Sequence, residues 1–296
     1  MLHGLDRQVL ERVAGSARRS VIGNSAGLRL TVAGRRTLRS ARRHQDLDKP
    51  AVTPLADMRA RTFHRAGVLR FDSSTSGPIV EAVATAFDDA MSRDEWCEDR
   101  GPSSAPAAHR YLVDAPLRLP AITDLLTDDV VSTAEAYYGC HVRVRSVRAY
   151  RNQGIEALDQ DEDVHANVWH LDPELTCDLR YFVFLTAVGA GDGPLETVNR
   201  RSTAAILRSG FLDGRHVVGP ARHILNRQAV VHNGAAGTGV LLAAEHCLHR
   251  AHVCSPGHHR DVVQFWLTPS SEPLGPDWGA QMPPDPAFHG GRPGDG

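Results

Sequence analysis

The spacing of apolar residues changes near the middle of the chain. In the first half, apolar residues recur every three or four positions in residues 79–87 and 120–138, which predicts two helices. Pro78 is typical of a helix start and Gly139 of a helix end. The apolar run at residues 66–71 predicts a strand that precedes the first of these helices.

From residue 140 onward the apolar runs shorten to the length of strands, and turn residues separate them. The predicted strands are residues 142–150, 167–172, 179–188, 216–218, 228–232, 239–245 and 260–268. Several short strands at this spacing are typical of a β-sandwich or barrel. We therefore predict a mainly β domain with helices packed on its outside.

Both ends of the chain differ from this middle part. Residues 1–61 are rich in arginine and are interrupted by glycines, so we predict an N-terminal extension with short helices. The extension could be a basic arm for an acidic partner, but solvated helices are the favoured interpretation. The domain itself is predicted to span residues 62–270. Residues 271–296 are rich in Pro and Gly and show no periodicity, which predicts a disordered or loosely packed tail.

Composition narrows the class of protein. The chain has 33 basic and 35 acidic residues, and this balance argues against a nucleic-acid partner. Its five cysteines are scattered and never form a CxxC pair, so neither a disulfide framework nor a zinc ribbon is indicated. The N-terminus lacks a secretory signal, and no apolar run is long enough to span a bilayer. We expect a cytoplasmic protein without a membrane partner, and leave open whether it forms a homodimer.

A candidate metal site lies in the predicted strand at residues 167–172. His170 and Asp172 are two positions apart, so on a strand their side chains point to the same face. Together with one more histidine from a distant strand, they would form the two-His-one-carboxylate triad typical of non-haem iron(II). The pattern is short and arises easily by chance among 16 histidines. A hydrogen-bonded pair without a metal is the alternative.

The second half of the candidate site lies near the end of the domain. The predicted strand at residues 239–245 leads to His249, and a Ser-Pro-Gly turn at residues 255–257 precedes Arg260. We predict a hairpin that brings Arg260 back beside His249. An arginine there can pair bidentately with the far carboxylate of a dicarboxylic acid whose other end chelates the metal.

These assignments have competitors. His246 and His252 could replace His249 as the third ligand, but neither keeps the eleven-residue step to Arg260. Arg260 itself could be an ordinary salt-bridge partner. Trp169, Arg148, Tyr150, Glu196 and Trp266 are expected near the mouth or lining of the barrel, where packing is as good an explanation as substrate contact.

Several of these segments resemble the phytanoyl-CoA dioxygenase family. The resemblance rests on residues 169–172 (Trp-His-Leu-Asp), on the strand at residues 181–188 that runs into 192–195, and on residues 248–251 (Leu-His-Arg-Ala) followed by the arginine eleven positions after the histidine. The triad together with its arginine is far more specific than any one of these motifs.

The resemblance covers about residues 62–270 and implies a fold, a metal and a co-substrate. The fold is a double-stranded β-helix, that is, a cupin-like jelly roll with flanking helices. The resemblance implies that His170, Asp172 and His249 hold Fe(II) and that Arg260 binds 2-oxoglutarate. Molecular oxygen (O2) is then the third reactant.

The chain departs from the family pattern at two places. Residues 199–203 replace a Pro-Gly-Ser-His turn that the family often has, which affects only the expected geometry of this loop. The family also often has a small hydroxyl residue two positions after the distal histidine, where this chain has Ala251. Thr186 is a candidate substitute for binding 2-oxoglutarate, with a core threonine as the equal alternative.

On this resemblance we expect an enzyme that hydroxylates, desaturates or cyclises a small-molecule substrate, in bacterial specialised metabolism. Asp172 argues against a halogenase, because related halogenases have a small residue in place of this carboxylate. Two alternatives are a cupin-type metal enzyme that does not use 2-oxoglutarate and a jelly-roll binding module without turnover. Arg260 argues against the first and the intact triad against the second.

Overall fold

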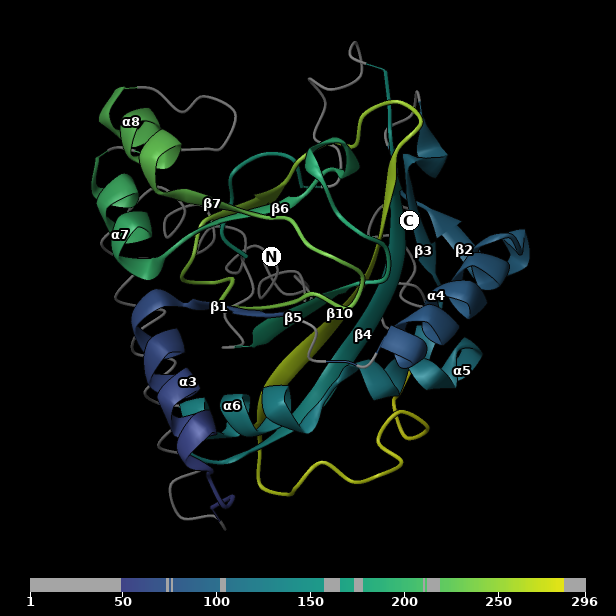
Figure 1. Cartoon of the computed structure of the whole chain (residues 1–296), viewed down its shortest axis with the longest axis horizontal. Coiled ribbons are helices and arrows are strands. Elements are labelled where there is room, and N and C mark those ends of the chain that lie inside the picture. The colour runs from purple at the N-terminus through teal and green to yellow at the C-terminus, as the bar shows by residue number, and fades with distance from the viewer. Residues whose placement is uncertain are drawn as a thin grey trace, which may run out of the picture.

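The computed structural model describes residues 49–72, 75, 77–101, 105–156, 166–172, 178–209, 211 and 219–284. Most of the arginine-rich extension, the strand predicted at residues 216–218 and the last part of the tail lie outside these residues. Within them the strands form two antiparallel sheets with helices around them (Figure 1). This confirms the predicted mainly β fold with flanking helices.

The larger sheet brings together strands that are far apart in the chain. Its seven strands lie in the order β1-β8-β5-β10-β4-β3-β2. Their bounds are β1 (Val68–Phe71), β2 (Cys97–Asp99), β3 (His109–Leu112), β4 (His141–Gln153), β5 (Leu179–Phe184), β8 (Gly239–Leu242) and β10 (His259–Ser270). The two longest strands, β4 and β10, pair from one end to the other, with a register shift between Trp266 and Leu267. Every pair in this sheet is antiparallel.

The smaller sheet has three strands in the order β7-β6-β9. Its strands are β6 (Leu195–Val198), β7 (Ala229–His232) and β9 (His249–Ala251). The central strand, β6, pairs with both of its neighbours in antiparallel fashion.

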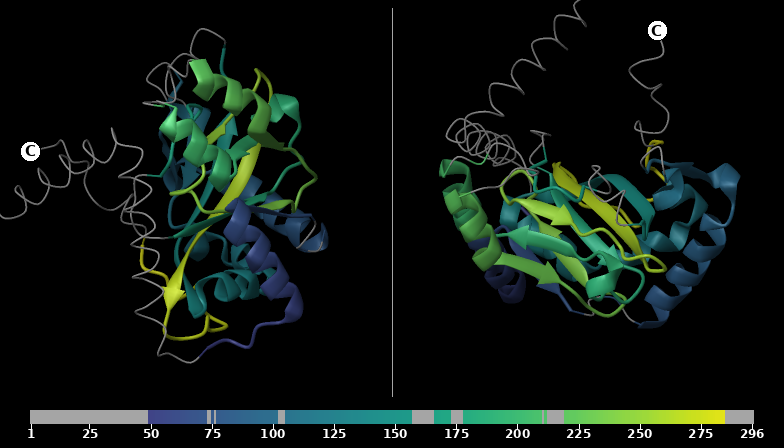
Figure 2. Two further views of the ribbon diagram at one scale, coloured as in Figure 1. Left: turned by 90° about the vertical axis from the view of Figure 1, so that its left-hand side faces the viewer. Right: turned by 90° about the horizontal axis from the view of Figure 1, so that it is seen from above.

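Six α-helices pack around the two sheets in the described part of the chain. They are α3 (Pro54–Ala66), α4 (Gly77–Met91), α5 (Ala115–Arg118), α6 (Asp128–Tyr138), α7 (Arg200–Arg208) and α8 (Gly219–Gln228). Helices α7 and α8 lie together beside the smaller sheet, whereas α4 and α5 lie at the opposite end of the molecule (Figures 1 and 2). Among the described helices, none combines the length and apolar character that crossing a bilayer requires.

The central strands of the larger sheet are covered on both faces, and β5 shows this most clearly. Tyr181 and Val183 join the large core formed with the helices, while Phe182 and Phe184 join a second cluster on the opposite face. All six residues of β5 are buried. A strand buried on both faces reads as a continuous apolar run, which is how this segment appears in the sequence.

The helix predicted over residues 120–138 is two helices in the structure. A 3-10 helix covers Pro120–Leu125, and α6 begins only at Asp128. Between them Thr127 has an extended backbone, with φ −77° and ψ 156°, and acts as the N-cap of α6. The apolar spacing continues across this break, so it could not reveal it. The predicted helix end at Gly139 is confirmed, with a left-handed φ of 71°.

The strand predicted from residue 66 begins two residues later, because α3 runs to Ala66. Gly67 ends the helix with a φ of 74°, and a Cβ at this position would collide with the sulfur of Cys247. Glycine is therefore required here by both the backbone and the packing. The strand β1 follows at Val68.

The division of the chain at residues 61 and 270 stays a prediction. Helix α3 extends across residue 61, and its Phe63 belongs to the large core. Beyond residue 270, the side chains of Leu274, Trp278 and Met282 pack against the same core.

A buried histidine makes the stability of the fold depend on pH. His232 is 4% exposed, and its Nε2 lies 2.8 Å from the hydroxyl oxygen of Thr197. Burial, together with the charge of Arg70, lowers the pKa of His232 from 6.5 to about 4. Between these two values the unfolded chain binds a proton that the folded protein does not, so the free energy of unfolding falls as the pH falls from 6.5 to 4.

We predict that His232→Gln reduces the change in the free energy of unfolding between pH 6.5 and pH 4. The variant should lose the contribution of His232 to this change, which is at most about 3.5 kcal/mol over the window, at roughly 1.4 kcal/mol per pKa unit. Urea unfolding between pH 4 and pH 7.5 measures it. Some slope should persist, because burial also lowers the pKa of His246 to about 4. An unchanged slope in the variant would contradict the assignment.

Candidate metal centre

The segment that carries His170 and Asp172 is held by backbone hydrogen bonds to two other parts of the chain. His170 and His249 each donate a backbone N–H to the carbonyl of the other, with both bonds at 3.1 Å. The N–H of Asp172 donates to the carbonyl of Ala244 at 3.2 Å. The prediction of a regular strand at residues 167–172 is therefore wrong. This segment pairs with the three-residue strand β9 at one position only, between His170 and His249.

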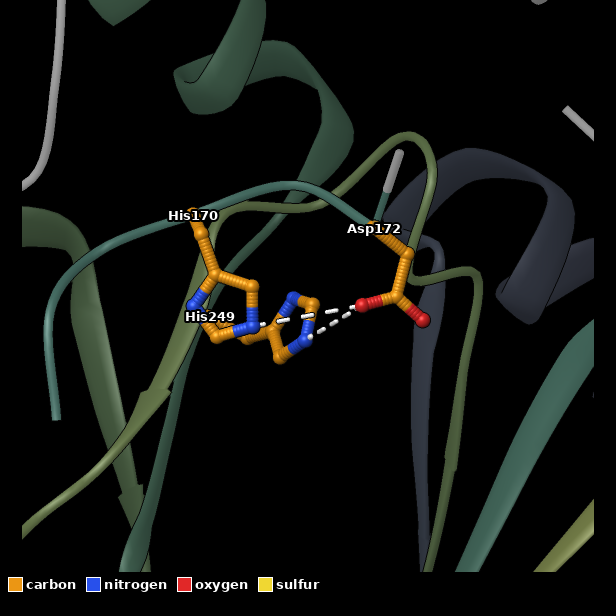
Figure 3. A group of neighbouring side chains, drawn as sticks. All are labelled: His170, Asp172 and His249. Carbon is orange, nitrogen blue, oxygen red and sulfur yellow. Dashed lines mark ion pairs between the residues drawn. The ribbon is translucent and has the colours of Figure 1, made fainter. Parts of the chain in front are cut away.

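The three predicted ligands nevertheless come together (Figure 3). One ligand atom of each of His170, Asp172 and His249 lies within 4.8 Å of the other two. The Oδ1 atom of Asp172 is 3.5 Å from Nε2 of His249 and 3.9 Å from Nε2 of His170. The side chains thus point toward one common position, as the sequence predicts for a metal site.

Main-chain carbonyls fix the protonation pattern of both imidazoles. Nδ1 of His170 lies 2.8 Å from the carbonyl oxygen of Val168, and Nδ1 of His249 lies 3.0 Å from that of Cys247. A carbonyl oxygen can only accept, so each Nδ1 carries the hydrogen. Each Nε2 then has its lone pair directed at the common position, as a metal ligand requires.

The carboxylate of Asp172 is held in its charged form. Burial alone would raise the pKa of Asp172, but His249 and His170 in their protonated forms, together with Arg180, outweigh burial and lower this pKa well below its ordinary value. Arg180 donates from Nε to Oδ2 of Asp172 at 2.9 Å. Two imidazole nitrogens and one carboxylate oxygen on one side of a pocket are the donor set of the iron(II) facial triad, so these residues fit a divalent transition metal.

The three residues lie at the wall of a cavity of about 370 Å³. Its lining includes five arginines, which are Arg100, Arg148, Arg180, Arg250 and Arg260. It also includes aromatic side chains, which are His109, Tyr111, Tyr150, Phe182, Phe184 and Trp266. Asp172 is the one carboxylate among the described residues of this lining. The cavity therefore combines a wall that carries the candidate metal ligands with aromatic and cationic surfaces.

Arg260 lines the same cavity as His249, but the predicted hairpin is wrong. Strand β9, which begins at His249, pairs with β6 in the smaller sheet, whereas β10, which contains Arg260, pairs with β4 and β5 in the larger sheet. The turn at residues 255–257 thus connects the two sheets. His249 and Arg260 approach the cavity from different sheets.

The environment of Arg260 is unusual for a cation. Its side chain is buried, with the residue 3% exposed, and burial lowers its pKa from the ordinary value. One guanidinium nitrogen donates to the carbonyl of Gly193, and Nε has no hydrogen-bond partner. In the described part of the chain, no carboxylate forms an ion pair with it. A buried cation of this kind is costly unless an anion reaches it.

The other residues singled out in the sequence divide into two groups. Arg148, Tyr150 and Trp266 line the cavity, whereas Trp169 and Glu196 lie outside its lining. Thr186 also lies outside the lining as the described residues define it, and its hydroxyl oxygen accepts a hydrogen bond from the backbone N–H of Asp261 at 3.4 Å.

Two other histidines near His249 in the sequence have carboxylate partners away from the site. His252 lies 2.8 Å from a carboxylate oxygen of Glu196, and His258 lies 2.8 Å from one of Asp192. Among the described residues, His246, His252 and His258 do not belong to the group of possible metal ligands. In the part of the chain that the structure describes, His249 is the histidine that lies together with His170 and Asp172, where the sequence predicts the third ligand.

Arg180 was not identified from the sequence, although a signal was present. It is the one charged residue in the apolar run of β5, and it is 2% exposed. A charge in a strand that is buried on both faces requires a partner of opposite charge. That requirement alone points to a carboxylate nearby.

We predict that His170→Ala, Asp172→Ala and His249→Ala each abolish the binding of a divalent metal. Loss of a partner outside the ligand set already weakens metal binding by about 10–100-fold, so loss of a ligand should exceed about 100-fold. Equilibrium dialysis against Co(II) measures this. His258→Ala is the matched control, since His258 is outside the cluster and should bind Co(II) as the original chain does. Undiminished binding by any of the three ligand variants would contradict the site.

Comparisons with known proteins bear on the fold. No protein-family model matches the sequence, and no curated protein matches it. Among solved structures, the chain is similar to the epimerase SnoN in complex with Fe3+, alpha ketoglutarate and nogalamycin RO, with 18% identity, a TM-score of 0.54, and coverage of 82% of this chain and 93% of that one.

Two further structures are similar to the same extent. EctD from S. alaskensis with 2-oxoglutarate and 5-hydroxyectoine has 15% identity and a TM-score of 0.56, over 82% of this chain and 86% of that one. The non-heme alpha ketoglutarate dependent carbocyclase SnoK from nogalamycin biosynthesis has 16% identity and a TM-score of 0.53, over 79% and 95%. The two-sheet architecture of this chain is thus the cupin-like jelly roll that the sequence predicts.

Proposed function

We propose that the chain is a non-haem iron(II) enzyme that uses 2-oxoglutarate and O2 to oxidise a small-molecule substrate. One observation carries the proposal. A facial set of two imidazoles and a carboxylate and a buried arginine without an anionic partner in the described structure face the same cavity. Two imidazoles and a carboxylate are the ligand set of non-haem iron(II), and a buried arginine can bind the far carboxylate of a dicarboxylic acid.

His170, Asp172 and His249 would hold the iron through Nε2, Oδ1 and Nε2. Bound iron would supply the oxidising power, together with 2-oxoglutarate and oxygen. The protein's part is to hold the Nδ1 hydrogens on the carbonyls of Val168 and Cys247, so that Nε2 of each neutral ring offers its lone pair, and to keep Asp172 ionised. Because all three ligands would bind the iron from one side, its opposite side would stay open for co-substrate and oxygen.

Arg260 would bind the far carboxylate of 2-oxoglutarate. The carbonyl of Gly193 fixes one side of its guanidinium, and the buried Nε atom has no hydrogen-bond partner among the described residues. The surrounding lining includes Phe184, Leu195 and Val262, which exclude water and strengthen a charge pair. Thr186 has no part in this proposal, because it lies outside the lining and accepts from Asp261.

The similar structures support the class without identifying a substrate. SnoN and EctD were each solved with a 2-oxo acid of this kind, and SnoN also with iron. A cavity of about 370 Å³ suits a small molecule.

We propose hydroxylation as the reaction, with desaturation and ring formation as related outcomes. We place this reaction in bacterial specialised metabolism in the cytoplasm. We also propose that the chain is related to the phytanoyl-CoA dioxygenase family, which its sequence resembles. The carboxylate of Asp172 argues against a halogenase.

The test uses the colour of the complex. Anaerobic addition of Fe(II) and 2-oxoglutarate should give the weak visible charge-transfer band of a chelated 2-oxo acid. Arg260→Ala should raise the apparent Kd for 2-oxoglutarate by at least about 30-fold, since truncating one member of a buried charge pair costs roughly 2 kcal/mol or more. Arg260→Lys should restore part of the affinity, because it keeps the charge but loses the bidentate geometry.

Arg208→Ala is the matched control, because Arg208 is an exposed arginine at the end of α7. It should bind 2-oxoglutarate like the original chain. Absence of the band in the original chain would overturn the proposal. If Fe(II) still binds in that case, a cupin-type metal enzyme that does not use 2-oxoglutarate becomes the better explanation.

A further inference from the structure

The two oxygens of Asp172 have different surroundings. Oδ1 faces Nε2 of both His170 and His249 at 3.9 and 3.5 Å. Oδ2 points away from this pair and accepts the hydrogen bond from Nε of Arg180 at 2.9 Å. Figure 3 shows that the dashed lines to both histidines meet at one oxygen of Asp172 and that the other oxygen takes no part in them. The carboxylate is thus oriented even without considering the metal.

Arg180 is itself held on its remaining sides. It is 2% exposed on β5, directly opposite Trp266 of the neighbouring strand β10. The centre of its guanidinium lies 3.3 Å from the centre of the Trp266 ring. Its NH1 atom lies 3.6 Å from Oδ2 of Asp178, which also accepts from Arg145 at 2.6 Å. The guanidinium that contacts Asp172 therefore has little freedom to move.

A carboxylate with two unrestrained oxygens can bind a metal through one oxygen or through both. A charge-assisted hydrogen bond to Oδ2 draws electron density from that oxygen and fixes the plane of the carboxylate. Rotation of Asp172 toward two-oxygen binding would break this bond and leave the buried guanidinium of Arg180 without its hydrogen bond to Asp172. Arg180 thus disfavours metal binding through both oxygens of Asp172, because it fixes the plane of the carboxylate and because breaking its hydrogen bond costs free energy.

We propose that Arg180 is a positioning residue that reserves Oδ1 of Asp172 for the metal and prevents binding through both oxygens. The inference rests on the proposed metal site and goes beyond it, because it assigns a role to a residue that is not a ligand. Its consequence is one additional open coordination position on the metal. That position is needed where a chelating co-substrate and oxygen must bind at the same metal.

The test uses Co(II) as the probe, since it needs neither 2-oxoglutarate nor a known substrate. Arg180→Met removes the donor and keeps a side chain of similar length. It should weaken Co(II) binding by about 10–100-fold, as loss of a partner of a ligand typically does. The visible Co(II) bands should also become weaker per metal bound, because two-oxygen binding raises the coordination number. Arg180→Lys should restore part of both properties.

Arg145→Gln is the matched control, since Arg145 contacts the same Asp178 and lies near the same Trp266, and its side chain is 41% exposed. It should match the original chain in Co(II) affinity and spectrum. Arg180→Met with unchanged affinity and spectrum, in a chain that binds Co(II), overturns the inference and leaves the metal site intact. Weaker binding with an unchanged spectrum overturns the one-oxygen mode. If Arg180→Met fails to fold, Arg180→Lys decides: Co(II) bands that are weaker per metal bound than those of the original chain support the inference, and bands of equal strength overturn it.

Failure of the original chain to bind Co(II) would overturn the metal centre itself. This result differs from the others, because it appears before any substitution at Arg180 is made. The original chain and the variants therefore separate the two proposals.

Discussion

The pair of backbone hydrogen bonds between His170 and His249 is the contact on which the site depends. It joins a segment that precedes β5 to the strand β9 and fixes the spacing of the two imidazoles. Hydrophobic packing supports it from behind, because Trp169 and Leu248, each the neighbour of a ligand, share a cluster with Ile206 and Leu225 of helices α7 and α8. The metal-binding wall is thus part of a packed unit, and the position of both histidines follows from that packing.

The wall of the cavity contains buried charged groups, Arg180 and Arg260 among them, and a buried charge needs compensation. Asp172 and Arg180 compensate one another, and Arg250 pairs with Glu196 at 2.7 Å. Arg260 differs from these, because it has a carbonyl partner and no carboxylate in the described structure. An electrostatic imbalance at one defined point is a stronger indication of an anionic ligand than a general excess of basic residues.

The sequence predicted much of the fold and all three residues of the metal cluster. Apolar spacing identifies α4, the end of α6 at Gly139, and most strands of the second half, because these segments place apolar side chains in the core at regular positions. It could not identify the break at Thr127, since backbone torsion is not visible in apolar spacing. It also could not show that residues 255–257 cross between sheets, because a turn motif has the same composition whether its strands pair or separate. Arg180 was missed because its partner, Asp172, is close only in space.

The tautomers of both ligand histidines depend on the carbonyls of Val168 and Cys247, which belong to the main chain. A main-chain carbonyl remains in place whatever side chain its residue carries. A change of side chain at position 168 or 247 therefore does not by itself remove the group that orients each imidazole. Distant homologues should keep the two histidines while the residues two positions before them vary, which is one reason why a metal site of this kind can outlast recognisable sequence similarity.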